Sequence, residues 1–211
     1  PRTVLDVDLN IPFVPIWNPD GIAVIIGNRD YVHRDVPPVE YALFDARTVK
    51  KYVKSMLGFA EENIIYIENA KKSDFELIFG TREVHEGKLY NWVKPNQSDV
   101  FIYYTGHGAP DFSTGKAYFM PVDSDPNYIK IGGYPLDVFY ENLSKIPARS
   151  ITVVLDACFS GASQSGMLIR QASPMFIDRE MPLLTVPGAI LTSSSGDQIS
   201  SWYPSARHSL F

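Results

Sequence analysis

Two short apolar segments, each ending at a reactive side chain, constrain the fold of this chain most strongly. Residues 100–105 are almost entirely apolar and lead into a Gly-His-Gly sequence centred on His107. A second apolar run, residues 151–155, leads to Cys158, the only cysteine of the chain. Buried parallel strands in α/β proteins have this near-continuous apolar pattern, and sites form at their carboxyl ends. We therefore expect two strands of one parallel sheet that bring His107 and Cys158 to the same edge.

Alternating strand and helix patterns over the rest of the chain predict an α/β fold with a mostly parallel sheet and helices on both faces. Strand patterns cover residues 22–27, 63–68, 100–105, 151–156 and 189–193, and helical patterns cover residues 39–57, 73–92 with a break near Gly80, and 136–146. Residues 109–134, rich in Gly, Pro and Asp, predict a hairpin and loop with a short strand at 117–120. Residues 1–20 are interpreted as an extended lead-in or linker, and residues 21–211 as one domain.

The pairing of His107 with Cys158 indicates a nucleophile and its acid/base partner. Each residue alone has an ordinary structural explanation, a buried packing cysteine or a loop histidine satisfied by its neighbours. Glycine after His107 favours the catalytic interpretation, because Gly108 lets a backbone N–H approach a substrate oxygen without obstruction. The other three histidines have no comparable context, and no chemistry is assigned to His33, His85 or His208.

These motifs, with a histidine about 50 residues before the cysteine, resemble those of the caspase-like cysteine peptidases. Within that family the chain is most similar to the metacaspases and their bacterial relatives, because Asp156 stands where caspases have Gln. The resemblance covers residues 23–211. It implies a three-layer caspase-like sandwich of about five to six strands, a Cys158–His107 dyad without a third catalytic side chain, and an oxyanion hole formed by the N–H groups of Gly108 and Cys158.

The same resemblance implies that the substrate side chain before the cleaved bond is Arg or Lys. Asp156 and Asp197 match two metacaspase aspartates that bind it, and two converging carboxylates suit a basic group. The structural alternatives are a turn-capping role for Asp156 and a solvated loop position for Asp197. Cleavage after Asp is the competing specificity, but caspases then need an arginine where this chain has Tyr203.

Two further expectations concern processing and the end of the chain. Residues 160–187 form a long predicted loop with Arg170 and Arg179, so a peptidase that accepts Arg has candidate self-cleavage sites there, as a zymogen would. The alternative is a solvated loop whose arginines favour solubility. The chain stops at Phe211 within a motif that, in the family, opens a helix and precedes another strand and helix. We therefore expect a missing C-terminal segment or additional domains.

Composition excludes several other classes of protein. The net charge of −5 and the absence of a basic cluster argue against nucleic acid as a partner, and no apolar run is long enough to span a membrane. Protein or peptide substrates and a cytoplasmic location fit best. A single cysteine rules out an internal disulfide or a Cys-rich zinc site. Many metacaspases are activated by calcium, so the resemblance makes calcium a candidate activator. The loop after His107 contains three aspartates, Asp111, Asp123 and Asp125. Roles in turns fit these residues better than calcium binding, and no metal ligands are assigned.

The motifs of the chain disfavour three other interpretations. A non-catalytic caspase-like scaffold would be expected to have lost Cys158 or His107, and both are present. An α/β hydrolase or a dinucleotide-binding domain would need Gly-x-Ser-x-Gly or Gly-x-Gly-x-x-Gly, and both motifs are absent.

Overall fold

The centre of the structure is a five-stranded parallel sheet with the strand order β10-β7-β3-β1-β2. This computed structural model describes residues 8, 10–157, 159, 162–163, 166–167, 186–193, 202–204, 207–209 and 211. The strands are β1 Ile22–Gly27, β2 Ile64–Glu68, β3 Asp99–Thr105, β7 Ser150–Asp156 and β10 Gly188–Thr192. The strands that precede His107 and Cys158 are therefore neighbours and end at the same edge of the sheet, as predicted.

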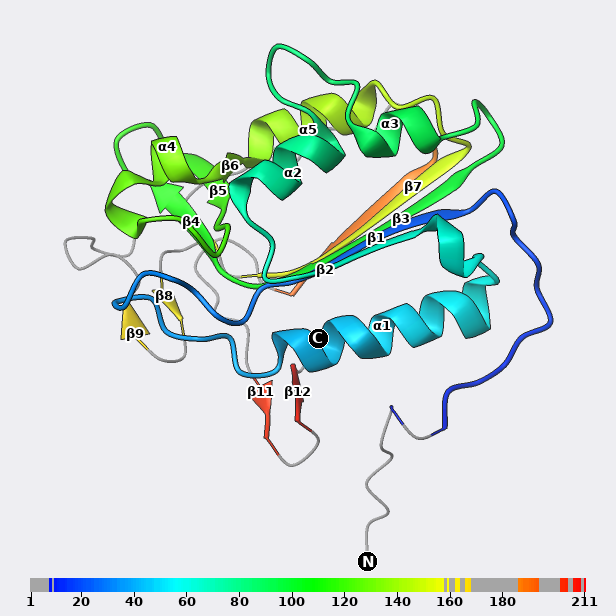
Figure 1. Cartoon of the computed structure of the whole chain (residues 1–211), viewed down its shortest axis with the longest axis horizontal. Coiled ribbons are helices and arrows are strands. Elements are labelled where there is room, and N and C mark those ends of the chain that lie inside the picture. The colour runs from blue at the N-terminus through cyan, green and yellow to red at the C-terminus, as the bar shows by residue number, and fades with distance from the viewer. Residues whose placement is uncertain are drawn as a thin grey trace, which may run out of the picture.

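Helices cover both faces of this sheet, so the predicted α/β sandwich is confirmed (Figure 1). One face carries α1 Ala42–Leu57, and the other carries α2 Lys72–Phe79, α3 Lys88–Trp92 and α5 Leu136–Ser144. Helix α1 begins three residues later than predicted, because the Val39 N–H bonds to the Arg29 carbonyl instead of entering a helix. It ends as predicted at Gly58, whose φ of 69° is left-handed and suits glycine.

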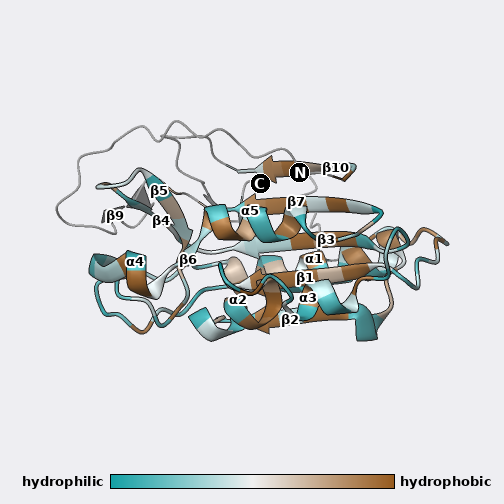
Figure 2. Ribbon diagram, turned by 90° about the horizontal axis from the view of Figure 1, so that it is seen from above, coloured by the Kyte–Doolittle hydropathy of each residue, from teal (hydrophilic) through white to brown (hydrophobic). Residues whose placement is uncertain are grey.

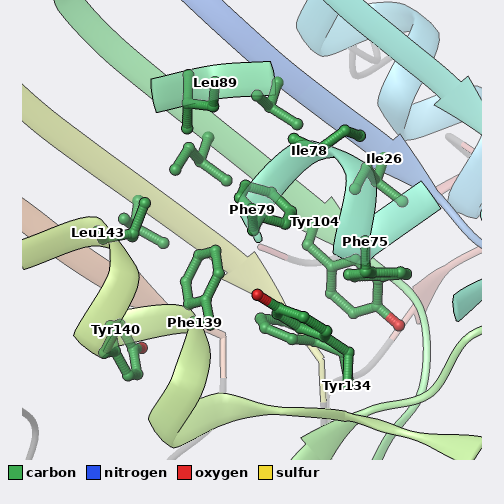
Figure 3. Packing of buried hydrophobic residues seen from close by; sticks show 14 of the residues in the cluster. Ile26, Phe75, Ile78, Phe79, Leu89, Tyr104, Tyr134, Phe139, Tyr140 and Leu143 are labelled. Carbon is green, nitrogen blue, oxygen red and sulfur yellow. The ribbon is translucent and has the colours of Figure 1, made fainter. Parts of the chain in front are cut away.

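The sheet separates two apolar cores. Figure 2 shows that its strands are mostly hydrophobic along their length. The larger core lies under α2, α3 and α5 and is rich in aromatic side chains (Figure 3). Phe75 stacks on Tyr134 with ring centroids 5.6 Å apart, and Phe79 meets Phe139 edge-on at 5.0 Å. Full burial of such a side chain stabilises the fold by about 1.5–3 kcal/mol. The smaller core lies between the sheet and α1 and includes Tyr103.

The carboxyl end of the sheet carries a smaller antiparallel sheet (Figure 1). The hairpin predicted after His107 is formed by β4 Gly108–Asp111 and β5 Lys116–Phe119, and β6 Tyr134–Pro135 adds a third strand that the sequence did not predict. Short helical turns precede β2 and β6, namely η1 Glu61–Asn63, η2 Pro126–Tyr128 and α4 Ile129–Gly132. This smaller sheet starts at Gly108, directly after His107.

Two short hairpins complete the described chain. The predicted long loop contains β8 Ala162–Ser163 paired with β9 Gly166–Met167. Near the end, β11 Trp202–Tyr203 pairs with β12 His208–Ser209, where the family resemblance implied a helix start. The left-handed φ of 57° at Arg207 allows the tight reversal into β12. No helix among the described residues is long and apolar enough to cross a membrane.

Candidate active site

His107 lies between β3 and β4, and its environment keeps the ring neutral. The residue is only 6% exposed, and its Nε2 lies 2.8 Å from the carbonyl oxygen of Pro37. Because a carbonyl only accepts hydrogen bonds, Nε2 carries the proton and Nδ1 carries the lone pair of the neutral ring. Burial lowers the pKa of His107 to about 4, and the bond to Pro37 only partly opposes this shift. Near pH 7 the ring is therefore neutral, with a lone pair on Nδ1.

Two tyrosines hold the backbone of His107. The Tyr31 hydroxyl accepts a hydrogen bond from the His107 N–H at 2.7 Å, and the Tyr104 hydroxyl donates to the His107 carbonyl at 2.6 Å. The Tyr31 ring also lies against the imidazole, with centroids 4.8 Å apart. Burial raises the pKa of Tyr31, so its hydroxyl stays protonated. Neither tyrosine was predicted to belong to the site, and both fix the orientation of His107.

Gly108 packs against the segment that contains Cys158. A Cβ at Gly108 would lie 2.3 Å from Cδ1 of Phe159, so only glycine fits without a shift of that ring. Cys158 itself lies outside the described residues, but its chain neighbours Ala157 and Phe159 are both described and buried. The predicted roles of Cys158 as nucleophile and of Gly108 and Cys158 as oxyanion donors stay predictions.

Asp156 presents a buried carboxylate beside the end of β3. It is the last residue of β7, pairs in register with Thr105, and is 6% exposed. Strand alternation places it on the α1 face with Val154, whereas Leu155 belongs to the opposite core. Its Oδ1 has no hydrogen-bond partner within the described part of the chain. A buried acceptor oxygen of this kind costs about 1–3 kcal/mol unless a ligand pairs with it.

Asp45 on α1 is a second buried carboxylate near Asp156, and the sequence analysis missed it. Burial raises the pKa of Asp45, and the charge of Asp156 contributes in the same direction. Burial and then both carboxylates raise the pKa of the Tyr103 hydroxyl, so the three groups share one region at the α1 face. The helical spacing could have identified Asp45, because it lies three residues after Ala42 and therefore on the buried face of the helix. We call Asp45 and Asp156 the acidic pair.

His208, to which no chemistry was assigned, contacts Asp45. Its Nδ1 bonds to Oδ1 of Asp45, and its Nε2 lies 3.2 Å from Oδ2 of Asp8. The Ser209 N–H donates to the other oxygen of Asp45 at 3.2 Å. The hairpin β11–β12 is thus attached to α1 at the acidic pair. His33, by contrast, lies 3.8 Å from a surface aspartate.

The three loop aspartates that were considered as calcium ligands form hydrogen bonds within the protein. Asp111 accepts from Ser113 and Thr114, Asp123 accepts from the Lys72 N–H, and Asp125 caps η2. Within the described residues no three acidic, His or Cys side chains cluster as metal ligands would.

Other predicted site residues fall outside the described part of the chain. These are Asp197, Arg170 and Arg179, whose predicted roles remain predictions. Tyr203, which stands where caspases have an arginine, lies on β11 and is 47% exposed.

Comparisons with known proteins agree with this geometry. The family model of the caspase domain matches residues 20–211. Caspase-1 from Spodoptera frugiperda has a similar structure, with a TM-score of 0.56 and 16% sequence identity over 95% of this chain and 69% of that chain. No curated protein sequence matches significantly. The match of the caspase-domain model over most of the sequence shows that the chain belongs to the caspase-domain family of cysteine peptidases.

Proposed function

We propose that the protein is a cysteine endopeptidase that cleaves protein substrates after Arg or Lys, with Cys158 as nucleophile and His107 as acid and base. The observation that carries this proposal is the neutral, buried His107, whose Nε2 is bound by Pro37 and whose Nδ1 therefore holds the lone pair. The caspase-domain match supports the same chemistry.

The proposed reaction has two stages. Nδ1 of His107 takes the thiol proton of Cys158, and the sulfur attacks the substrate carbonyl carbon to form a C–S bond. The N–H groups of Gly108 and Cys158 stabilise the oxyanion. The imidazolium then protonates the leaving amine, the C–N bond breaks, and a thioester remains. His107 next takes a proton from water, whose oxygen attacks the thioester. The C–S bond breaks, the acid leaves, and the imidazolium returns the proton to the thiolate of Cys158.

The specificity for Arg or Lys is supported by the unpartnered Oδ1 of Asp156. A guanidinium or ammonium group would supply the hydrogen bonds and the positive charge that this buried carboxylate lacks. Asp45 lies close enough to Asp156 to interact with it, and its carboxyl group would offer a second set of acceptor oxygens to the basic side chain. Asp197 is proposed as a further carboxylate, on the family resemblance alone.

Peptide-library cleavage by purified protein tests both parts of the proposal. Cys158→Ala and His107→Ala should each abolish cleavage, and the double variant should be little worse than either single one, because the pair acts as a unit. Asp156→Asn should lower kcat/KM for Arg peptides on the order of a hundredfold, the equivalent of about 3 kcal/mol for breaking a buried ion pair.

A matched control is Asp20→Asn, because Asp20 lies just before β1 at the opposite end of the sheet and pairs with Lys94 on the surface. This variant should cleave like the wild type. Substantial activity in Cys158→Ala would refute the peptidase proposal, and a profile dominated by cleavage after Asp would refute the basic specificity. Running each assay with and without calcium tests the proposed activation by that ion.

Self-cleavage after Arg170 or Arg179 is a separate proposal, based on the sequence of the long loop and the proposed specificity. Wild-type and Cys158→Ala protein should be incubated side by side and their fragments mapped by mass spectrometry. The proposal expects fragments ending at one of these arginines in the wild type only. It is wrong if both proteins stay intact or are cut alike.

A further inference from the structure

We propose that His208 is an internal cation that competes with the basic side chain of the substrate for Asp45 and so sets the affinity of the acidic pair for Arg and Lys. This inference rests on the proposed function and adds a specificity-determining residue to it. His208 lies on β12, far from both catalytic motifs in the sequence.

The geometry around the His208 ring favours its charged form. The residue is 8% exposed, and each ring nitrogen faces a carboxylate, Asp45 at Nδ1 and Asp8 at Nε2. A neutral imidazole donates through only one nitrogen, so the other would direct a lone pair at a carboxylate oxygen. The imidazolium form donates to both carboxylates and offsets part of their charge.

The contact with His208 occupies the carboxylate of Asp45, to which a basic side chain of the substrate would also bind. The hairpin β11–β12 binds both oxygens of Asp45, one through the His208 ring and one through the Ser209 N–H. Asp156 keeps an oxygen without a partner in the described chain. A basic side chain at Asp156 gains the full attraction of Asp45 only when His208 gives up its bond, so the measured affinity includes the cost of displacing His208.

The surroundings of His208 are mostly acidic. In the described chain, the charged and titratable groups around His208 are Asp8 on the N-terminal segment, Asp45 on α1 and Arg207 on its own hairpin, with Asp156 on β7 and Tyr103 on β3 near Asp45. Because the ring contacts Asp45 directly, removing the ring frees that carboxylate to pair with a substrate cation.

Steady-state kinetics on an Arg peptide test the inference. His208→Ala and His208→Gln should each lower KM about 3- to 10-fold, because the group that competes for Asp45 is gone, and leave kcat unchanged. His85→Gln is the matched control, since His85 lies beside Tyr90 in the α2–α3 region, on the opposite face of the sheet, and its kinetics should equal those of the wild type. KM values that are unchanged or raised in both His208 variants would overturn the inference.

A second measurement does not depend on turnover. In the Cys158→Ala protein, agmatine, which carries a free guanidinium group, should shift the imidazole NMR signals of His208, assigned by their loss in the His208→Gln background. Absence of a saturable shift would overturn the inference even if Arg peptides are cleaved. Failure of the wild type to cleave Arg peptides would instead refute the proposed specificity, and the agmatine titration would still report on His208.

Discussion

Acid should destabilise this protein through one buried side chain, His107. In the unfolded chain a histidine has a pKa of about 6.5, whereas burial lowers the pKa of His107 in the folded protein to about 4. Above about pH 6.5 the ring is neutral in both states and contributes no pH dependence. Between about pH 6.5 and 4 the unfolded chain binds the proton and the folded protein does not, so the free energy of unfolding decreases as the pH falls. Each pKa unit of difference is worth about 1.4 kcal/mol, which gives a total loss of about 3 kcal/mol.

Urea denaturation of the wild type and of His107→Asn, at a series of pH values from neutral to about 4, isolates this contribution. Carboxylates elsewhere titrate in both proteins, so they cancel in the difference between the two curves. We expect the wild type to lose about 3 kcal/mol more than the variant over this range. Parallel curves for wild type and His107→Asn would show that His107 is not held neutral by burial.

Three further substitutions test the contacts around the site and the sheet. Gly108→Ala should destabilise the fold by about 1–3 kcal/mol in urea titrations and reduce peptide cleavage, because its Cβ would overlap the neighbouring phenylalanine ring; wild-type behaviour would contradict the close packing. Tyr31→Phe leaves the His107 N–H without its acceptor and should lower kcat more than it changes KM, whereas equal effects on binding and turnover would argue against a positioning role. A neighbouring guanidinium lowers the pKa of Asp99 to about 2, so the ionised carboxylate should stabilise the fold by about 1 kcal/mol near neutral pH. Asp99→Asn should therefore lower the free energy of unfolding by that amount, and the difference from the wild type should vanish in acid.

The sheet and the position of His107 were predictable from sequence for a specific physical reason. Strands buried on both faces must be apolar along their whole length, and β1, whose residues are all buried, shows this pattern directly. Because neighbouring strands of the sheet run parallel, their carboxyl ends lie at one edge. Gly58 marked the end of α1 because its left-handed backbone suits glycine.

The partners of His107 were not predictable in this way. Pro37 contributes a backbone carbonyl, which has no side-chain signature, and Tyr31 lies in an irregular segment without a period. The bond between Asp45 and His208 joins residues 163 positions apart, so no local pattern links them. Strand β6 has only two residues and exists because β5 offers it an edge, which is a tertiary effect.

The acidic pair gives a last prediction, in which stability and function oppose each other. Asp156 is buried, lacks a partner for Oδ1 among the described residues, and lies close enough to Asp45 to raise its pKa. In the absence of substrate the Oδ1 atom costs free energy, because a buried acceptor without a hydrogen bond has lost its contact with water. Asp156→Asn removes the charge and the repulsion, so it should raise the free energy of unfolding by about 1–2 kcal/mol while it impairs cleavage after Arg. Agmatine should stabilise the wild type against urea and leave the variant nearly unaffected, since only the wild type offers the full negative charge to a guanidinium group. A variant less stable than the wild type would mean that Asp156 is already satisfied in the folded protein, and the argument from its unpartnered oxygen would then be wrong.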